Sequence, residues 1–232
     1  MIDRGQIKEN TMAVSYIKRF IRLLAGLFLF AFGTYLIVQA DIGLAPWEAF
    51  SMGLSLVTGI SFGNVVIITG ILILVIDYLL HEQFGFGTIL NALLIGTFID
   101  MLQWSGIVPK MEHYASGIAL LLAGEVIICL ATFLYVGSGL GCGPRDALMV
   151  GLGKRFPKRP IGLIRGAIEG SVLLVGWLLG AKIGIGTVIA VFGISFILQY
   201  TFKLLRFNVT AVQHESILDT LRIWRTAKER QT

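Results

Sequence analysis

The stretch Gly43–Phe50, GLAPWEAF, decides the fold because it occurs twice in the chain. The second copy is Gly141–Leu148, GCGPRDAL, which keeps the glycine, the proline, an acidic residue and the alanine at the same relative positions. The copies begin at positions 43 and 141, an offset of 98 residues. A long stretch repeated at a fixed offset indicates that the chain consists of two copies of one structural unit.

Shorter segments on both sides extend the repeat. Upstream, Leu24–Gly26 matches Leu122–Gly124 at the same offset. Downstream, GFGT at Gly85–Thr88 matches GIGT at Gly184–Thr187 at an offset of 99 residues, which one inserted residue explains. We therefore expect repeats at residues 18–105 and 115–206, a linker at 106–114, and terminal tails at 1–17 and 207–232.

The composition places both repeats in a membrane. The 232 residues are 56% hydrophobic and 14% charged, whereas a soluble domain carries about 25% charged residues. Several apolar runs approach the ~20 residues that a helix needs to cross the hydrocarbon core. The runs lack the alternating polarity of membrane β-strands, so the sequence predicts an all-α polytopic membrane protein.

Each repeat contains three long apolar runs and one short helix. The expected spans cover residues 20–39, 63–80, 86–104, 117–136, 162–180 and 185–203. The short helices begin at Pro46 and Pro144, since proline suits the first turn of a helix, and end near Gly59 and Gly153. The first short helix is about 20 Å long at 1.5 Å per residue, which is less than the ~30 Å thickness of the hydrocarbon core.

Two topologies fit this pattern. If each short helix is re-entrant, leaving the membrane on the side where its loop entered, each repeat has three spans and the repeats are inverted, as in many transporters. If the short helices cross fully, the chain has eight spans and parallel repeats. We favour the first because the helices are short and because the second one ends in the basic cluster Lys154–Arg159, which the positive-inside rule places in the cytoplasm. The eight-span model has its own support, because it puts Lys110 inside.

Both chain ends are expected on the cytoplasmic side of the cell membrane. Basic residues flank the membrane part, with Lys18, Arg19 and Arg22 before the first span and Lys203 and Arg206 after the last. Positive charge at these positions holds the ends in the cytoplasm. In the C-terminal tail, apolar residues between Ile217 and Trp224 have helical spacing among basic residues. This pattern fits a helix on the membrane surface and equally a solvated helix.

The two proline-led turns form the candidate binding site. Non-helical backbone survives at membrane depth only when it is buried in protein or lines a water-filled cavity. Each short helix points its N-terminal N–H groups, a partial positive charge, toward its turn, and two such ends meeting in mid-membrane would bind a small solute or ion. The predicted substrate-binding residues are Pro46, Trp47, Glu48, Pro144, Arg145 and Asp146. In the alternative interpretation, Glu48 and Asp146 only cap their own helices.

Arg145 breaks the symmetry of the repeat, because its counterpart is Trp47. An arginine beside a helix N-terminus can bind a carboxylate or phosphate through two parallel hydrogen bonds. The alternative is an internal ion pair with Asp146 or Glu125.

Three more ionisable residues lie within predicted spans, namely Glu125, Arg165 and Glu169. Arg165 and Glu169 are four residues apart on one helix face, so we expect a structural ion pair. Glu125 lies midway along its span, where an ionisable group is costly and by default a functional candidate. It either carries a coupling proton or neutralises Arg145 or Arg165. The polar residues near span ends, expected to be partly hydrated, are Asp77, Asp100 and Gln199.

No catalytic or metal-binding signature is present. The sequence lacks the H-E-x-x-H, G-x-S-x-G and phosphate-loop motifs, and its three histidines are not at metal-ligand spacing, so we expect neither an enzyme nor a cofactor. The net charge of +5 is typical of cytoplasmic loops and not of nucleic-acid binding. The expected partners are the lipid bilayer and a small solute, and six spans leave room for a homodimer. The alternative function is a scaffold or regulator that acts on a cytoplasmic partner through Lys154–Arg159 and the C-terminal tail.

The doubled motif resembles the YczE/YyaS/YitT family of bacterial integral membrane proteins, and most resembles its YczE branch. The resemblance covers about residues 20–205 and rests on GLAPWEA at 43–49, GFGT at 85–88, GCGPRDALM at 141–149 and GIGT at 184–187. Cys142 stands where a small residue is expected. The resemblance implies a bacterial cytoplasmic-membrane protein and supplies no catalytic residues. One member of the branch is associated with production of non-ribosomal or polyketide-type metabolites, which keeps a regulatory role open.

Overall fold

The computed structural model describes residues 4–82, 84–212 and 214–216, which form eight α-helices and a short 3₁₀ turn. The elements are α1 (Arg4–Ala40), α2 (Pro46–Thr58), α3 (Phe62–Leu79), α4 (Phe86–Ser105), α5 (Tyr114–Val136), α6 (Pro144–Arg155), α7 (Ile161–Leu178), α8 (Ile185–Leu204) and η1 (Val209–Ala211). Within this described part, six helices are long and apolar enough to cross a membrane, namely α3, α4, α5, α7, α8 and the Val14–Ala40 part of α1. The protein is therefore an all-α polytopic membrane protein, as its sequence predicts.

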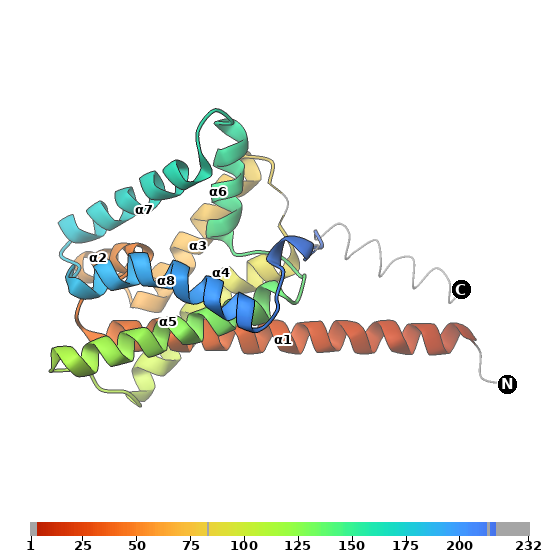
Figure 1. Cartoon of the computed structure of the whole chain (residues 1–232), viewed down its shortest axis with the longest axis horizontal. Coiled ribbons are helices and arrows are strands. Elements are labelled where there is room, and N and C mark those ends of the chain that lie inside the picture. The colour runs from red at the N-terminus through yellow and green to blue at the C-terminus, as the bar shows by residue number, and fades with distance from the viewer. Residues whose placement is uncertain (1–3, 83, 213, 217–232) are drawn as a thin grey trace.

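The helix boundaries lie close to the predicted ones, with one large difference. Helix α1 begins at Arg4, so residues 4–17, predicted as a tail, continue the helix of the first span. Its 37 residues give a helix about 55 Å long, and Figure 1 shows its N-terminal end projecting beyond the other helices. The predicted amphipathic segment that starts at Ile217 lies outside the described residues.

Helices α1 and α5 lie side by side and antiparallel (Figure 1). They approach closely where small residues face each other. A Cβ atom added at Gly33 would lie 2.7 Å from the carbonyl oxygen of Gly124, and one added at Gly124 would lie 2.7 Å from that of Gly33. Gly26, the counterpart of Gly124, faces Ala131, the counterpart of Gly33. The α1–α5 interface is thus symmetric: exchanging each residue for its counterpart in the other helix gives the same pair of contacting positions.

The glycine-rich turn before the last helix of each repeat holds the first loop of the other repeat. The N–H of Gly87 donates a 2.8 Å hydrogen bond to the carbonyl of Leu140, and the N–H of Gly186 donates a 3.0 Å bond to that of Ile42. These two bonds join equivalent positions of the two copies. In each loop the next residue is a glycine with a positive φ, 127° at Gly43 and 136° at Gly141, a conformation that glycine adopts without steric cost.

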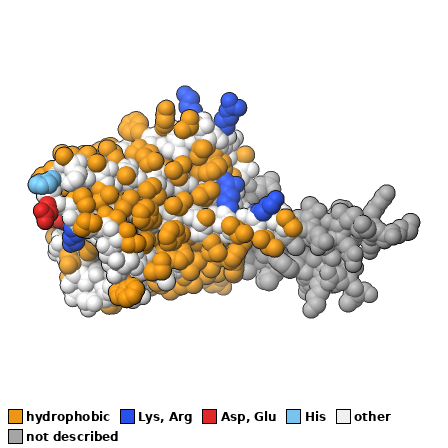
Figure 2. Space-filling model, turned by 90° about the horizontal axis from the view of Figure 1, so that it is seen from below, with side chains coloured by type: hydrophobic (Ala, Val, Ile, Leu, Met, Phe, Trp, Pro, Cys, Tyr) orange, Lys and Arg blue, Asp and Glu red, His pale blue; other side chains and the backbone are white. Residues whose placement is uncertain are grey.

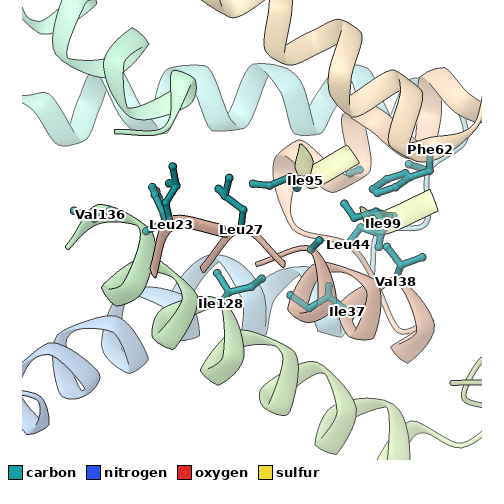
Figure 3. Packing of buried hydrophobic residues seen from close by; sticks show 14 of the residues in the cluster. Leu23, Leu27, Ile37, Val38, Leu44, Phe62, Ile95, Ile99, Ile128 and Val136 are labelled. Atoms are coloured by element: carbon teal, nitrogen blue, oxygen red, sulfur yellow. The ribbon is translucent and has the colours of Figure 1, made fainter. Parts of the chain in front are cut away.

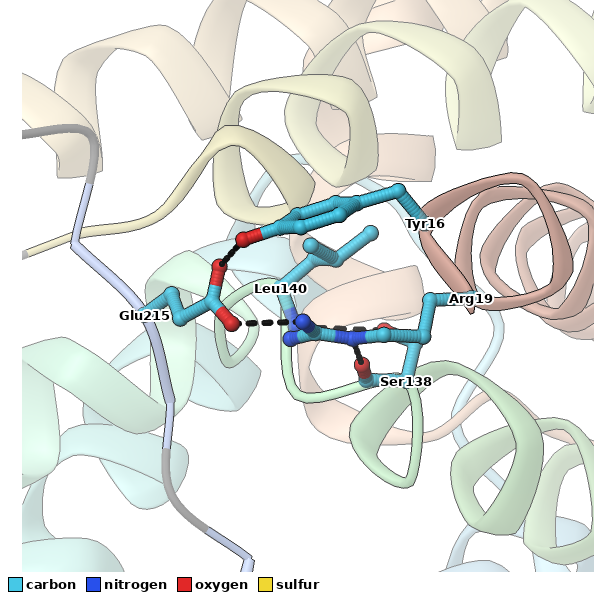
Figure 4. A network of polar contacts seen from close by, with 5 residues as sticks. All are labelled: Tyr16, Arg19, Ser138, Leu140 and Glu215. Carbon is cyan, nitrogen blue, oxygen red and sulfur yellow. Dashed lines mark hydrogen bonds and ion pairs between the residues drawn. The ribbon is translucent and has the colours of Figure 1, made fainter. Parts of the chain in front are cut away.

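A polar cluster fastens the chain after η1 to the start of the first span (Figure 4). Glu215 pairs with Arg19 and accepts a 2.9 Å hydrogen bond from the hydroxyl of Tyr16. Arg19 Nε donates a 2.7 Å bond to the carbonyl of Ser138, and the N–H of Glu215 donates to the carbonyl of Gly139. This cluster therefore holds together α1, the loop that leads to α6, and the end of the described chain.

Around the α1–α5 pair the remaining helices form a symmetric pattern of neighbours. Helix α4 packs against α1 and α8 packs against α5, while α2 packs against α7 and α3 against α6. The buried core centres on α1 and α5, where Leu23, Leu27 and Ile128 pack with Ile95 and Ile99 of α4 (Figure 3). Figure 2 shows hydrophobic side chains over most of one face, with charged side chains toward its ends and one edge, as expected for a surface in contact with lipid.

One pair of neighbours breaks this symmetry. Helices α3 and α4 are tightly packed, since a Cβ atom added at Gly63 would overlap the carbonyl oxygen of Gly96. The corresponding helices α7 and α8 are apart. Cβ atoms added at Gly162, Gly166 and Gly170 of α7 would meet no described atom within 4 Å, and only 11% of the α7 span is buried. The last two spans of the second predicted repeat are therefore packed less closely than those of the first.

Candidate functional site

A cavity of about 260 Å³ lies where the first turns of α2 and α6 meet α5, α7 and α8. All nine site residues predicted from the sequence line it: Pro46, Trp47, Glu48, Glu125, Pro144, Arg145, Asp146, Arg165 and Glu169. These residues come from both repeats and from four different helices. The structure thus brings into one place residues that lie up to 123 positions apart in the chain.

The starts of α2 and α6 have the local structure that the sequence predicts. Pro46 and Pro144 occupy the first turns, and the preceding residues Ala45 and Gly143 are extended. Neither of these N-cap residues supplies a side-chain hydrogen bond to its helix. The positive ends of both helix dipoles therefore face the cavity without a side-chain N-cap.

Arg145 joins the two helix starts. Its Nη1 atom lies 3.4 Å from Oε1 of Glu48, and its guanidinium carbon lies 4.8 Å from the centre of the Trp47 ring. A guanidinium over an indole face is attracted by the ring quadrupole. Arg145 therefore forms an internal ion pair, as the alternative interpretation held, but with Glu48 in place of Asp146 or Glu125. The carboxylate of Glu48 lies in the first turn of α2 and is the partner of Arg145.

Two further polar pairs line the cavity. Arg165 Nε lies 2.8 Å from Oε1 of Glu169, which is the ion pair expected from their spacing. The hydroxyl of Tyr135 donates a 3.4 Å hydrogen bond to Asp146. Asp146 lies inside the protein, but its side chain is accessible because it faces the open space of the cavity.

Glu125 is fully buried, and among the described residues neither of its carboxylate oxygens has a hydrogen-bond partner. It faces α8, where a Cβ atom added at Gly193 would lie 2.9 Å from Oε2. Of the two alternatives for Glu125, neutralisation of Arg145 or Arg165 is not observed, since these guanidinium groups pair with Glu48 and Glu169. Glu125 is therefore a polar group at the cavity wall that the protein itself does not satisfy.

One of the polar residues near span ends differs from the expected partial hydration. Asp77 is fully buried because α6 packs over the end of α3. Within the described part of the chain its carboxylate has no hydrogen-bond partner. Asp100 is partly exposed, as expected. It binds the hydroxyl of Ser61 and accepts a 2.7 Å hydrogen bond from the N–H of Gly63, so it holds the start of α3 against α4. Gln199, its counterpart in the second repeat, is exposed as expected.

Several lining residues were missed from the sequence. Cys129 and Thr132 follow Glu125 by four and seven positions, which places them on the same helix face, so this spacing could have identified them. Tyr135 gives no comparable signal. Over the described residues, no cluster of three or more histidine, cysteine or acidic side chains suits a metal ion.

Sequence comparison identifies the family. Residues 17–203 match the model of a family of unknown function, DUF6198. The chain belongs to this family. It is 33% identical to the uncharacterised membrane protein YczE of Bacillus subtilis (strain 168), over 76% of this chain and 82% of YczE. It is also 31% identical to an uncharacterised protein of Haemophilus influenzae (88% of this chain, 93% of the relative) and 25% identical to YyaS of Bacillus subtilis (72% and 83%).

These relatives agree with the resemblance of the doubled motif to YczE and YyaS. No solved structure matches this DUF6198 chain significantly.

Proposed function

We propose that this protein is a small-solute permease of the bacterial cell membrane whose binding site is the cavity between α2 and α6. One observation carries the proposal: a short helix from each repeat begins at the same cavity. With 13 and 12 residues, these helices are about 20 Å and 18 Å long, too short to cross a hydrocarbon core of ~30 Å. Paired broken helices whose N-termini face a midplane site are typical of secondary transporters.

The reciprocal contacts support an inverted repeat. Helices α1 and α5 are antiparallel, and the bonds Gly87–Leu140 and Gly186–Ile42 join equivalent positions in opposite directions. In such transporters one repeat moves against the other around a fixed site. The difference between the packed α3–α4 pair and the separated α7–α8 pair fits one of two such states, in which the repeats hold different conformations.

The test is a solute screen followed by Arg145→Ala. A panel of metabolites is added to the purified protein in detergent, and a solute that raises the melting temperature is then tested for uptake into proteoliposomes. We expect Arg145→Ala to abolish uptake because it leaves Glu48 without its charged partner and removes the link between the helix starts. Arg155→Ala is the control, since Arg155 is exposed on the same helix away from the cavity. Normal uptake by a folded Arg145→Ala protein would refute the proposed site.

A second function, as a scaffold or regulator of a cytoplasmic partner, is favoured by one observation. The basic residues Lys154, Arg155, Lys158 and Arg159 are all exposed at the end of α6 and in the following loop, although Lys154 is paired with Glu82 at 2.7 Å. The double variant Lys158→Ala/Arg159→Ala separates the functions. If the protein is a scaffold, the double variant loses the cellular phenotype and keeps uptake. If it is only a permease, the double variant keeps both.

A further inference from the structure

The charged groups around the cavity are unbalanced. Four carboxylates line it, from Glu48, Glu125, Asp146 and Glu169, but only two guanidinium groups, from Arg145 and Arg165. Both guanidinium groups already have partners, Glu48 at 3.4 Å and Glu169 at 2.8 Å. No unpaired cation is left among the described lining residues to receive an anion. The expectation that Arg145 binds a carboxylate or phosphate of the solute therefore loses its basis.

The two remaining carboxylates are not equivalent. Asp146 accepts a hydrogen bond from Tyr135 and has the guanidinium groups of Arg165 and Arg145 nearby to offset its charge. Glu125 has none of these and is fully buried. An ionised carboxylate without a partner inside a protein is strongly destabilising, so Glu125 needs a proton or a bound cation. As an unsatisfied, fully buried group at the cavity wall, it marks where a positive group of the ligand would lie.

The other lining residues limit the kind of cation. Most are apolar, including Phe30, Ile95, Ile128 and Ile194. A metal ion requires several oxygen, nitrogen or sulfur ligands, and the described residues offer no suitable cluster. A volume of about 260 Å³ is slightly below the range of roughly 300–1,000 Å³ that is typical of sites for drug-sized ligands. The space therefore suits a small organic molecule with an apolar body.

We infer that the cavity binds a small organic monocation, an alkylammonium or arylalkylammonium compound, with its ammonium group against Glu125 and its apolar part against the aliphatic and aromatic wall. The ring of Phe30 lies edge-on to that of Tyr135, with centroids 6.2 Å apart, and adds an aromatic surface to this wall. Aromatic faces attract organic cations. The inference rests on the proposed permease function and names the solute class for the same site.

The experiment uses three probes of similar shape and different charge: benzylammonium, benzyl alcohol and benzoate. Their binding to the purified full-length protein is measured by isothermal titration calorimetry at pH 7. We expect benzylammonium to bind at least tenfold more tightly than the other two. Glu125→Gln, which keeps the side-chain shape and removes the charge, is expected to weaken benzylammonium binding at least tenfold. Glu112→Gln is the matched control, since Glu112 is exposed in the linker.

Each other outcome contradicts the inferred ligand class or the role of Glu125, and none of them by itself refutes the permease function. Unchanged benzylammonium binding by Glu125→Gln overturns the role of Glu125. Preferred binding of benzoate, lost in Arg145→Ala, overturns the cation class but leaves the permease site in place. Absence of binding by all three probes also overturns the inference, and the metabolite screen then decides the permease function separately. If Glu125→Gln does not fold, the charge series on the unmodified protein still decides the ligand class.

Discussion

Single glycines set the distance between the two central helices. The backbones at Gly33 and Gly124 are so close that an added methyl group on either would overlap the carbonyl of the other. We predict that Gly124→Ala destabilises the protein by about 1–3 kcal/mol, the usual cost of overpacking. Gly166→Ala is the control, because nothing described lies within 4 Å of the added carbon, and we expect no loss of stability there. The measurement is thermal unfolding in detergent, and equal destabilisation by both variants would contradict the prediction.

Asp77 and Asp100 provide a matched pair of carboxylates on neighbouring helices. Asp77 is buried with no hydrogen-bond partner among the residues that the structure describes, whereas Asp100 binds Ser61 and Gly63. We predict that Asp100→Asn lowers the free energy of unfolding by about 1.5 kcal/mol, because it weakens hydrogen bonds to a charged group. Asp77→Asn removes a buried charge that nothing compensates, so it should leave stability unchanged or increase it. Chemical unfolding in detergent compares the two, and a larger loss at Asp77 would show that its carboxylate has an essential partner.

The sequence predicts residue contacts only where they are local. The pair Arg165–Glu169 follows from a spacing of four on a helix. The predicted cavity residues come from the two proline-led turns and from the ionisable residues within the spans. The bond between Arg145 and Glu48 joins residues 97 positions apart and depends on how α2 and α6 meet, which no local pattern encodes. The burial of Asp77 was missed for the same reason, since it depends on α6 packing over the end of α3.

At the scale of elements, apolar length predicted all six candidate spans, and proline predicted the starts of α2 and α6. The ends were less predictable. Helix α6 continues through Lys154 to Arg155 and not only to about Gly153, because basic residues in a last turn interact favourably with the helix dipole. The N-terminal extension of α1 was missed because residues 1–17 are polar and were therefore predicted as a tail. A polar composition indicates contact with water, and it does not exclude a helix.

The separation of α7 from α8 leads to a prediction about movement. In the first repeat Gly63 contacts Gly96, and the equivalent positions in the second are Gly162 and Ser195. If the proposed permease alternates between two states, cysteines at 162 and 195 should form a disulfide when membranes are treated with a mild oxidant. The native cysteines are first replaced, as Cys129→Ala and Cys142→Ser. Mass spectrometry of the linked peptides detects the product.

The control for this experiment pairs Gly162→Cys with Val188→Cys. Both positions lie near the first turns of successive spans that run in opposite directions, so they lie toward opposite sides of the membrane and should never cross-link. A 162–195 pair that stays reduced under all conditions, including with a transported solute present, would show that α7 does not close onto α8.

At the scale of the whole molecule, six spans place the α4–α5 linker and the α6–α7 loop on opposite sides of the membrane. We predict that a cysteine at Ile107, in the linker and 69% exposed, is labelled by an impermeant maleimide in intact cells. A cysteine at Lys158 should be labelled only after the membrane is made permeable. The same cysteine-free background serves both variants. Labelling of neither position in intact cells would support eight spans, since that topology puts both inside.

The exchanged hydrogen bonds at Gly87 and Gly186 have a consequence for any chain that contains only one unit. In such a chain the N–H of the glycine-rich turn would have no loop carbonyl to bind, and the loop carbonyl would have no turn N–H. It would satisfy both by associating with a second copy of itself inserted upside down in the bilayer. A single-unit ancestor with this packing would thus have needed dual orientation, and joining two genes end to end would have fixed one orientation for each half.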